Sequence, residues 1–294
     1  MFLGKAIGKY LFSFLLFAIL FGFGVKSVDA TTLVFVHGKG SGKDTVSNVT
    51  NTYWTTDMIR ASTRNYAAKS LVVSYDGSQY YWDTVSDIAA QVNNYLNQYP
   101  NEKLVFVCHS YGGIQMRFIL CNSATSAPYY NYRGSNFARI ATATSHVITL
   151  ATPHGGSAVA DLGSTLSNSA FTSWIVSLVD NNSNASKVLT TSHLQYAGQN
   201  WLRDSLRTKA FYTVAGTNTL NHIYHLNDVG LGTLSLLAPF SGSNATNDGL
   251  VGLASAHYPG APGGDWFNTT ANHDHNRHND DPGYIGNTIG QYGW

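Results

Sequence analysis

The sequence contains few charged residues, a single glutamate and very few cysteines. Charged side chains make up 11% of the 294 residues, and the formal net charge is +1. This composition gives no indication of a surface for nucleic acid or for an acidic partner. Glu102 is the only glutamate. Any other catalytic carboxylate must therefore belong to an aspartate.

The two cysteines, Cys108 and Cys121, are not expected to form a disulfide. A helix is predicted to begin near Ser110, which places Cys121 about 11 residues along it, roughly 16 Å from the turn. A disulfide requires Cα atoms within about 7 Å of each other. We therefore expect two free, largely buried thiols.

The one long apolar run, residues 10–25, lies near the start of the chain. Lys5 and Lys9 precede it, and small residues of the kind that a signal peptidase reads follow it up to Ala30. At about 16 residues, the run is shorter than the roughly 20 residues needed to span a bilayer. The pattern predicts a signal peptide over residues 1–30 and a secreted protein, extracellular or periplasmic, after cleavage near Ala30.

Residues 31–294 have a length that suits one large α/β domain. Short apolar runs predict buried strands at 32–36, 70–75, 103–107, 146–151 and 210–215. The apolar positions from Val85 to Tyr99 follow one helical face, and Pro100 ends that helix. Alternating strands and helices predict a mainly parallel sheet built from βαβ units. The long segment 156–206 is predicted to contain a helical cap inserted over the site, and packing in the core is the alternative explanation of its aromatic residues.

A serine follows the third predicted strand and precedes a segment with helical spacing, in Cys108-His109-Ser110-Tyr111-Gly112. A turn this tight strains the serine backbone, exposes the hydroxyl and tolerates only small residues two positions before and after it. Gly112 meets that requirement, and Cys108 stands where the nucleophile elbow motif GxSxG has its first glycine. Ser110 is therefore a candidate nucleophile, with an ordinary strand and Ser/Gly turn as the alternative.

A nucleophilic serine needs a base, a carboxylate that orients the base, and backbone N–H groups for the oxyanion. The segment 272–278 supplies three candidate bases, which are His273, His275 and His278. Among the aspartates between Ser110 and this segment, only Asp228 and Asp248 lie in the loop region after the last predicted strand. The backbone N–H of Tyr111 adjoins the serine, and that of Lys39 follows the first strand.

Five motifs, in this order, resemble those of secreted lipases of the α/β-hydrolase superfamily, such as the bacterial triacylglycerol lipases. The family patterns are HG plus a small or apolar residue, GHSxGG, TPHxGS, NDGxV and NHxD. The corresponding residues here are His37-Gly38-Lys39, Cys108-His109-Ser110-Tyr111-Gly112-Gly113, Thr152-Pro153-His154-Gly155-Gly156-Ser157, Asn247-Asp248-Gly249-Leu250-Val251 and Asn272-His273-Asp274. Together they cover nearly all of the predicted mature chain.

The resemblance implies an α/β-hydrolase fold, with helices on both faces of a mainly parallel sheet, and hydrolysis of carboxylic esters by a lipase or esterase. It implies a catalytic triad and an acyl-enzyme intermediate, and it assigns one residue of this chain to each role in the triad. Ser110 would be the nucleophile, Asp248 the orienting acid and His273 the base, while the amides of Lys39 and Tyr111 would form the oxyanion hole. No cofactor is implied.

His275 and His278 remain alternative bases. The family has an acidic residue two positions after the catalytic histidine that helps to hold a structural calcium, but this chain has His275 there, so no metal site is expected. A second interpretation is a metal-dependent hydrolase, because His273, His275 and His278 form an HxHxxH cluster that could bind zinc. A third is a non-catalytic α/β binding protein.

The glycine-rich loop 38–45 does not fit a nucleotide site. The P-loop motif requires glycine where this chain has His37, and serine or threonine where it has Asp44. The partner expected from the resemblance is an ester or lipid substrate, with no nucleotide or nucleic acid, and the chain is expected to be a monomer.

Overall fold

The structure is a computed structural model, and it describes most of the chain. The described residues are 30–40, 44–161, 183–206, 209–218, 246–257 and 269–294. From Thr31 onward they belong to one compact unit. The predicted signal peptide, except for Ala30, and residues 162–182 of the predicted cap lie outside the described residues.

In the described part of the chain, six strands form one sheet in which every neighbouring pair is parallel. Their order across the sheet is β2-β1-β3-β4-β5-β6. The strands are β1 (Thr31–Val36), β2 (Lys69–Val73), β3 (Lys103–His109), β4 (Thr144–Leu150), β5 (Phe211–Gly216) and β6 (Thr269–Ala271). The five predicted strands are confirmed. No pattern predicted β6, because its three residues are too few to show a period.

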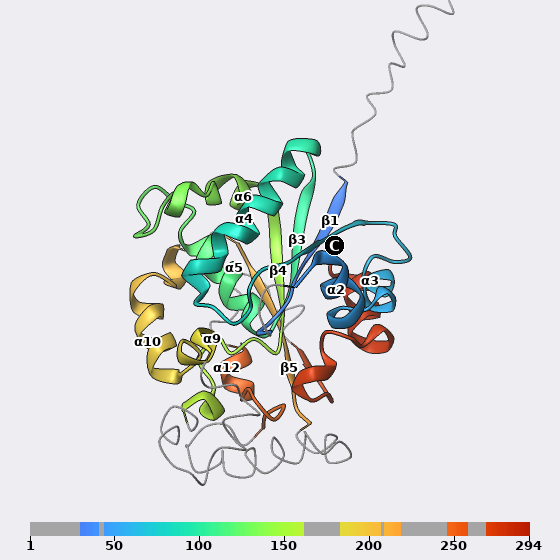
Figure 1. The fold of residues 1–294 in the computed structure, drawn as a ribbon. Helices are drawn as coiled ribbons and strands as arrows, with labels where there is room; N and C mark the ends of the chain where they lie inside the picture. Colours follow the sequence, from blue (N-terminus) through green and yellow to red (C-terminus); the bar gives the residue numbers. More distant parts are fainter. Residues whose placement is uncertain (1–29, 41–43, 162–182, 207–208, 219–245, 258–268) are drawn as a thin grey trace, which may run out of the picture. The chain divides into compact units, whose positions relative to one another are not determined.

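Helices pack on both faces of the sheet, with α4, α5 and α6 on one face and α3 on the other (Figure 1). The α-helices are α2 (Val46–Asn48), α3 (Thr56–Ser62), α4 (Tyr81–Gln98), α5 (Tyr111–Cys121), α6 (Phe137–Ala143), α9 (Asn184–Lys187), α10 (Thr191–Asn200), α12 (Leu253–His257) and α13 (Asn287–Tyr292). Short 3-10 or π segments are η1 (Val49–Tyr53), η2 (Tyr132–Gly134), η4 (Asp204–Leu206), η7 (His275–Arg277) and η8 (Pro282–Gly286). The helix predicted before Pro100 is α4.

The central strand β3 shows why its sequence is apolar at nearly every position. Phe106 and Cys108 pack into the core on the side of α4 and α5. Val105 and Val107 pack into the core on the side of α3. Successive side chains of a strand point to opposite faces, so a strand covered on both faces has no position left for a polar side chain.

Cys108 and Cys121 are buried and do not form a disulfide, as predicted. Cys108 packs into the core below the turn, and Cys121 ends α5, so the helix keeps the two apart. In the described part of the chain, we find no helix that is both long enough and apolar enough to span a membrane.

The turn from β3 into α5 has the strained geometry that the sequence predicts. Ser110 adopts φ 51° and ψ −122°, a conformation that residues with a Cβ rarely occupy. A Cβ at Gly112 would lie closer than 3.0 Å to the backbone carbonyl oxygens of Val36 and His37. The first turn of α5 can therefore approach the end of β1 only if position 112 is glycine.

We predict that Gly112→Ala lowers the free energy of unfolding by about 2 kcal/mol or more, since the added methyl meets backbone that cannot move alone. Gly155→Ala is the matched control, because its added Cβ meets no atom closer than 3.5 Å. Urea unfolding of both variants measures the difference. Equal stability of the two variants would contradict the close approach described above.

Candidate active site

The candidate site lies at the carboxyl ends of the parallel strands. The chain passes from β1 to its neighbour β2 on one side and then returns to β3 on the other side of β1. The loops after β1 and β3 therefore diverge at a topological switch point, where open α/β sheets bind ligands. Lys39, after β1, and Ser110, after β3, both line a cavity of about 520 Å³ at this place.

Ser110 is placed by the strained turn, and its hydroxyl does not cap α5. Its backbone N–H donates to the carbonyl oxygen of Leu150 at the end of β4, over 2.8 Å. Its hydroxyl instead lies 2.9 Å from Nε2 of His275. The turn therefore directs the oxygen of Ser110 toward an imidazole.

His275 joins Ser110 to Asp248. Its Nδ1 lies 3.0 Å from Oδ2 of Asp248. An ionised carboxylate can only accept, so Nδ1 carries the proton and Nε2 accepts from the hydroxyl of Ser110. All three side chains are buried, with Asp248 1% exposed. The three side chains form one series of hydrogen bonds, the geometry that a base and an orienting acid require beside a nucleophilic hydroxyl.

Asp248 is held as an ionised group by a tight turn. Its Oδ1 accepts the backbone N–H groups of Leu250, over 3.0 Å, and Val251, over 2.7 Å. Burial favours the neutral acid, but the neighbouring His275 and the backbone N–H donor of Val251 outweigh it and hold the pKa of Asp248 below its usual value. Asp228, the other candidate acid, lies outside the described residues.

The predicted contact of His273 with Ser110 is wrong, and His275 takes that place. His273 bonds through Nε2 to Asp281, at the start of η8. The chain enters the 3-10 turn η7 at His275, whose backbone N–H donates to the carbonyl oxygen of Asp248 over 3.0 Å. This backbone bond draws position 275 rather than 273 against the acid. The motif NHxD alone gives no signal for that shift of two residues.

His278 is fully buried, and its ring stacks on that of His109 with 6.5 Å between the centroids. Among the described residues, neither of its ring nitrogens has a hydrogen-bond partner. Burial lowers the pKa of His278 from 6.5 to about 4; the attraction of Asp248 opposes this change, and the charge of His275 adds to it. His278 is therefore a neutral imidazole at neutral pH.

The three histidines of the HxHxxH cluster do not converge on one point. His275 bonds to Ser110 and Asp248, while His273 bonds to Asp281. Within the described ranges, no group of three or more histidine, cysteine or acidic side chains is arranged to hold a metal ion. The zinc interpretation requires all three rings at one ion, and this geometry does not provide that.

The two predicted oxyanion donors come from the two loops that meet at Ser110. Tyr111 is the first residue of α5, so its N–H has no acceptor within the helix. Lys39 lines the cavity, and the residue before it, Gly38, lies against Ser110: a Cβ at Gly38 would lie 2.9 Å from the Cβ of the serine.

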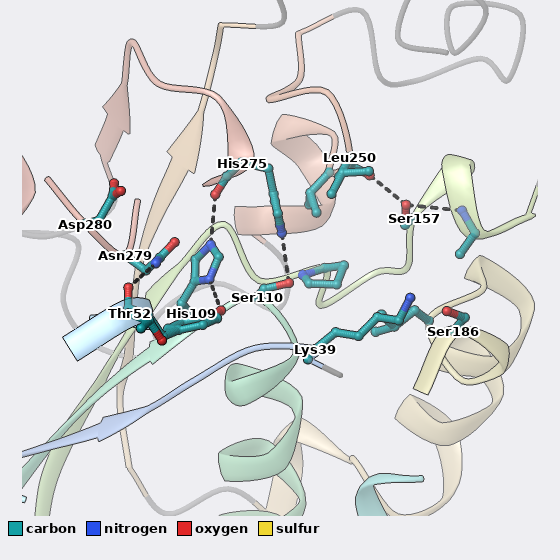
Figure 2. A pocket seen from close by; sticks show the side chains of 16 residues that line it. Lys39, Thr52, His109, Ser110, Ser157, Ser186, Leu250, His275, Asn279 and Asp280 are labelled. Carbon is teal, nitrogen blue, oxygen red and sulfur yellow. Dashed lines mark hydrogen bonds between the residues drawn. The ribbon is translucent and has the colours of Figure 1, made fainter. Parts of the chain in front are cut away.

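Both polar and apolar side chains line the cavity (Figure 2). Figure 2 shows Lys39, Ser186 and Leu250 to one side of Ser110 and Thr52, Asn279 and Asp280 to the other. The described lining residues are Lys39, Gly40, Thr52, Tyr53, His109, Ser110, Pro153, Ser157, Ala160, Ser186, Leu189, Leu250, Val251, His275, Asn279 and Asp280. A small organic substrate fits a site of this size with one reactive group at its centre.

The comparisons with known proteins concern the family and the fold of the chain. The sequence model of the family described as "Putative serine esterase (DUF676)" matches residues 29–223. The matched range includes Ser110 and ends before Asp248 and His275. No curated protein sequence matches the chain.

Several solved structures share the fold. The mature Bacillus licheniformis lipase BlEst2 is 20% identical, with a TM-score of 0.60 over 85% of this chain and 86% of that one. Lipase 1 from Pelosinus fermentans is 16% identical, with a TM-score of 0.59 over 90% and 97%. Staphylococcus hyicus lipase is 17% identical, with a TM-score of 0.53 over 88% and 90%. These likenesses confirm the predicted α/β-hydrolase fold.

The lowered pKa of His278 predicts how stability depends on pH. In the unfolded chain a histidine binds a proton below its ordinary pKa of 6.5, whereas folded His278 binds it only below about 4. Between these values the unfolded state holds more protons, so the free energy of unfolding falls as the pH falls, by roughly 3 kcal/mol for this group.

Urea unfolding at a series of pH values checks this expectation. His278→Asn removes the titrating group, so we expect the variant to lose less stability than the native chain between pH 7 and pH 4, whatever its stability at pH 7. Two parallel curves would show that His278 is not protected from protonation in the folded protein.

Proposed function

Because the chain belongs to the family of serine esterases whose sequence model it matches, we propose that it hydrolyses carboxylic esters, as a lipase or esterase, through Ser110, His275 and Asp248. The observation that carries this proposal is the series of hydrogen bonds from Ser110 through His275 to Asp248. In this series, a hydroxyl on a strained turn faces an acceptor nitrogen, and a buried carboxylate fixes the tautomer of that ring.

In the proposed mechanism, Nε2 of His275 takes the hydroxyl proton while Oγ of Ser110 attacks the acyl carbonyl carbon. The imidazolium that forms is stabilised by the carboxylate of Asp248, whose pKa is already lowered by contact with His275. His275 then returns the proton to the leaving alcohol, and an acyl-enzyme remains. Attack by water, with His275 again as the base, releases the acid.

The negative oxygen that develops on the carbonyl needs donors that are in place beforehand. We assign this role to the backbone N–H groups of Tyr111 and Lys39. Tyr111 supplies a donor at the N-terminus of α5, where the helix dipole also favours negative charge. Side-chain identity at both positions then matters little, which is consistent with a lysine at position 39.

We predict that a fluorophosphonate probe labels the native protein covalently and does not label Ser110→Ala. The probe needs an activated serine hydroxyl, and Ser110 faces the acceptor nitrogen of His275. Hydrolysis of p-nitrophenyl esters should be lost in the same variant. Ser157→Ala is a matched control, because Ser157 lines the cavity but donates its hydroxyl to the backbone carbonyl of Leu250.

Two results would refute this proposal. One is a native protein that hydrolyses esters, stays unlabelled and loses activity to a chelator, as the zinc interpretation requires. The other is a native protein with no ester hydrolysis and no labelling, as expected of a binding protein.

The two neighbouring histidines provide a direct test of the base. We predict that His275→Ala lowers kcat by about 10² to 10⁴, the usual contribution of a general base. His273→Ala should lower kcat by less than about tenfold, because its imidazole bonds to Asp281 instead of the serine. Steady-state kinetics on one short-chain ester compares the two variants. The opposite order of effects would return the role of base to His273.

A further inference from the structure

Tyr53, the last residue of η1, lines the cavity and contacts the loop that carries Lys39. Its hydroxyl oxygen accepts the backbone N–H of Gly38 over 2.7 Å. The same hydroxyl bonds to Nδ1 of His109, the residue before the candidate nucleophile. Tyr53 therefore connects the loop after β1 to the end of β3.

His109 continues the connection to the segment that carries the base. Its Nε2 lies 2.9 Å from the backbone carbonyl oxygen of His275. A carbonyl only accepts, so Nε2 carries the proton and Nδ1 accepts the hydroxyl proton of Tyr53. Each hydrogen bond in the series Gly38, Tyr53, His109 and His275 then has a defined donor and a defined acceptor.

This series requires a neutral His109, since a protonated ring would have no acceptor for the hydroxyl of Tyr53. The surroundings satisfy the requirement. Burial holds the pKa of His109 well below its ordinary value, and the neighbouring His275 and His278 lower it further. The backbone carbonyl of His275 acts in the opposite direction, and His37 is a further ring that disfavours charge.

His37 holds the peptide between Gly38 and Lys39 through the carbonyl oxygen of Gly38. Nδ1 of His37 lies 2.8 Å from the carbonyl oxygen of Gly38, and the ring of His37 stacks on Tyr75 at 4.1 Å. In a trans peptide the C=O and the following N–H point in opposite directions. The N–H of Lys39 therefore points away from His37, and its direction is set by the bonds on Gly38.

We propose that Tyr53 and His109 are positioning residues that hold the oxyanion loop at Gly38 and the base segment at His275 in one fixed relation. Neither side chain reacts with substrate in this account. Tyr53 fixes the backbone from which the Lys39 donor extends, and His109 fixes the backbone from which the imidazole of His275 extends. The proposal rests on the proposed function, because it gives the two side chains a role in that same site.

A displacement of about 1 Å in a catalytic group is enough to cost about 10² in rate. We therefore expect Tyr53→Phe to lower kcat for p-nitrophenyl butyrate by about ten- to hundredfold, with KM changed by less than about threefold. The variant keeps the ring and its packing on His37 and Trp54, so loss of the fold is not expected. A thermal unfolding curve checks that expectation.

Tyr81→Phe is the matched control. The hydroxyl of Tyr81 is also buried, bonds to a histidine, His193, and accepts an N–H, that of Trp201, yet Tyr81 does not line the cavity. We expect this variant to show a comparable change in unfolding temperature but a kcat within about twofold of native. If kcat falls in Tyr53→Phe but not in Tyr81→Phe, the loss comes from the place of Tyr53 in the site and not from a general decrease in protein stability.

His109→Asn tests the other half of the series. The shorter side chain keeps an acceptor near the hydroxyl of Tyr53 but cannot reach the carbonyl of His275, so kcat should again fall with KM little changed. If both residues act through one series of bonds, the double variant loses no more rate than the worse single variant. Losses that multiply would show two independent effects and contradict the coupling.

The measurements separate the two proposals. A native protein without ester hydrolysis and without fluorophosphonate labelling refutes the proposed function. A native protein that is active and labelled at Ser110, with Tyr53→Phe at full kcat, refutes the positioning role alone. Affinity for an alkyl boronic acid, which forms a tetrahedral adduct with an active serine, should fall in Tyr53→Phe in parallel with kcat. An unchanged affinity would also refute the positioning role.

Discussion

The close approach of the first turn of α5 to the end of β1 is the constraint on which the site depends. Gly112 permits it, because any Cβ there would meet the carbonyl oxygens of Val36 and His37. Gly38 permits the reciprocal contact with Ser110. Parallel pairing of β1 with β3 brings these two loops to one edge of the sheet, and the glycines let their backbones meet there. The strain at Ser110 is one cost of this contact.

The histidines around this contact differ in role because their surroundings differ. His275 has both a carboxylate and a hydroxyl as partners, so its two nitrogens have opposite roles. His109 and His278 are enclosed by other side chains, and burial lowers the pKa of each. A neutral imidazole can be donor and acceptor at once, which makes His109 suitable as a link between backbone segments. Within one region, His275 is the candidate base, His109 connects two backbone segments by hydrogen bonds, and His278 is a buried neutral side chain.

Local backbone chemistry determines the turn at Ser110, whereas a contact between distant segments determines which histidine faces the serine. A strand, a serine and small flanking residues together predict the turn at Ser110, and all of these lie within a few residues of one another in the sequence. The place after the last long strand leaves Asp228 and Asp248 as candidates, and the resemblance to the NDGxV motif selects Asp248. His273 was favoured over His275 by a motif, but the choice depends on a backbone bond between His275 and Asp248, far apart in the sequence. No local pattern contains that bond.

Patterns in the sequence are sufficient to predict the five long strands, the turn at Ser110, the lack of a disulfide between the two cysteines and the parallel α/β class. Each of these follows from hydrophobic period, glycine and proline placement or chain length, which act over one element. Contacts between distant segments determine which histidine faces the serine and how Tyr53 reaches Gly38, and burial determines which imidazoles stay neutral. Those outcomes depend on burial and on contacts between segments that only the folded sheet brings together.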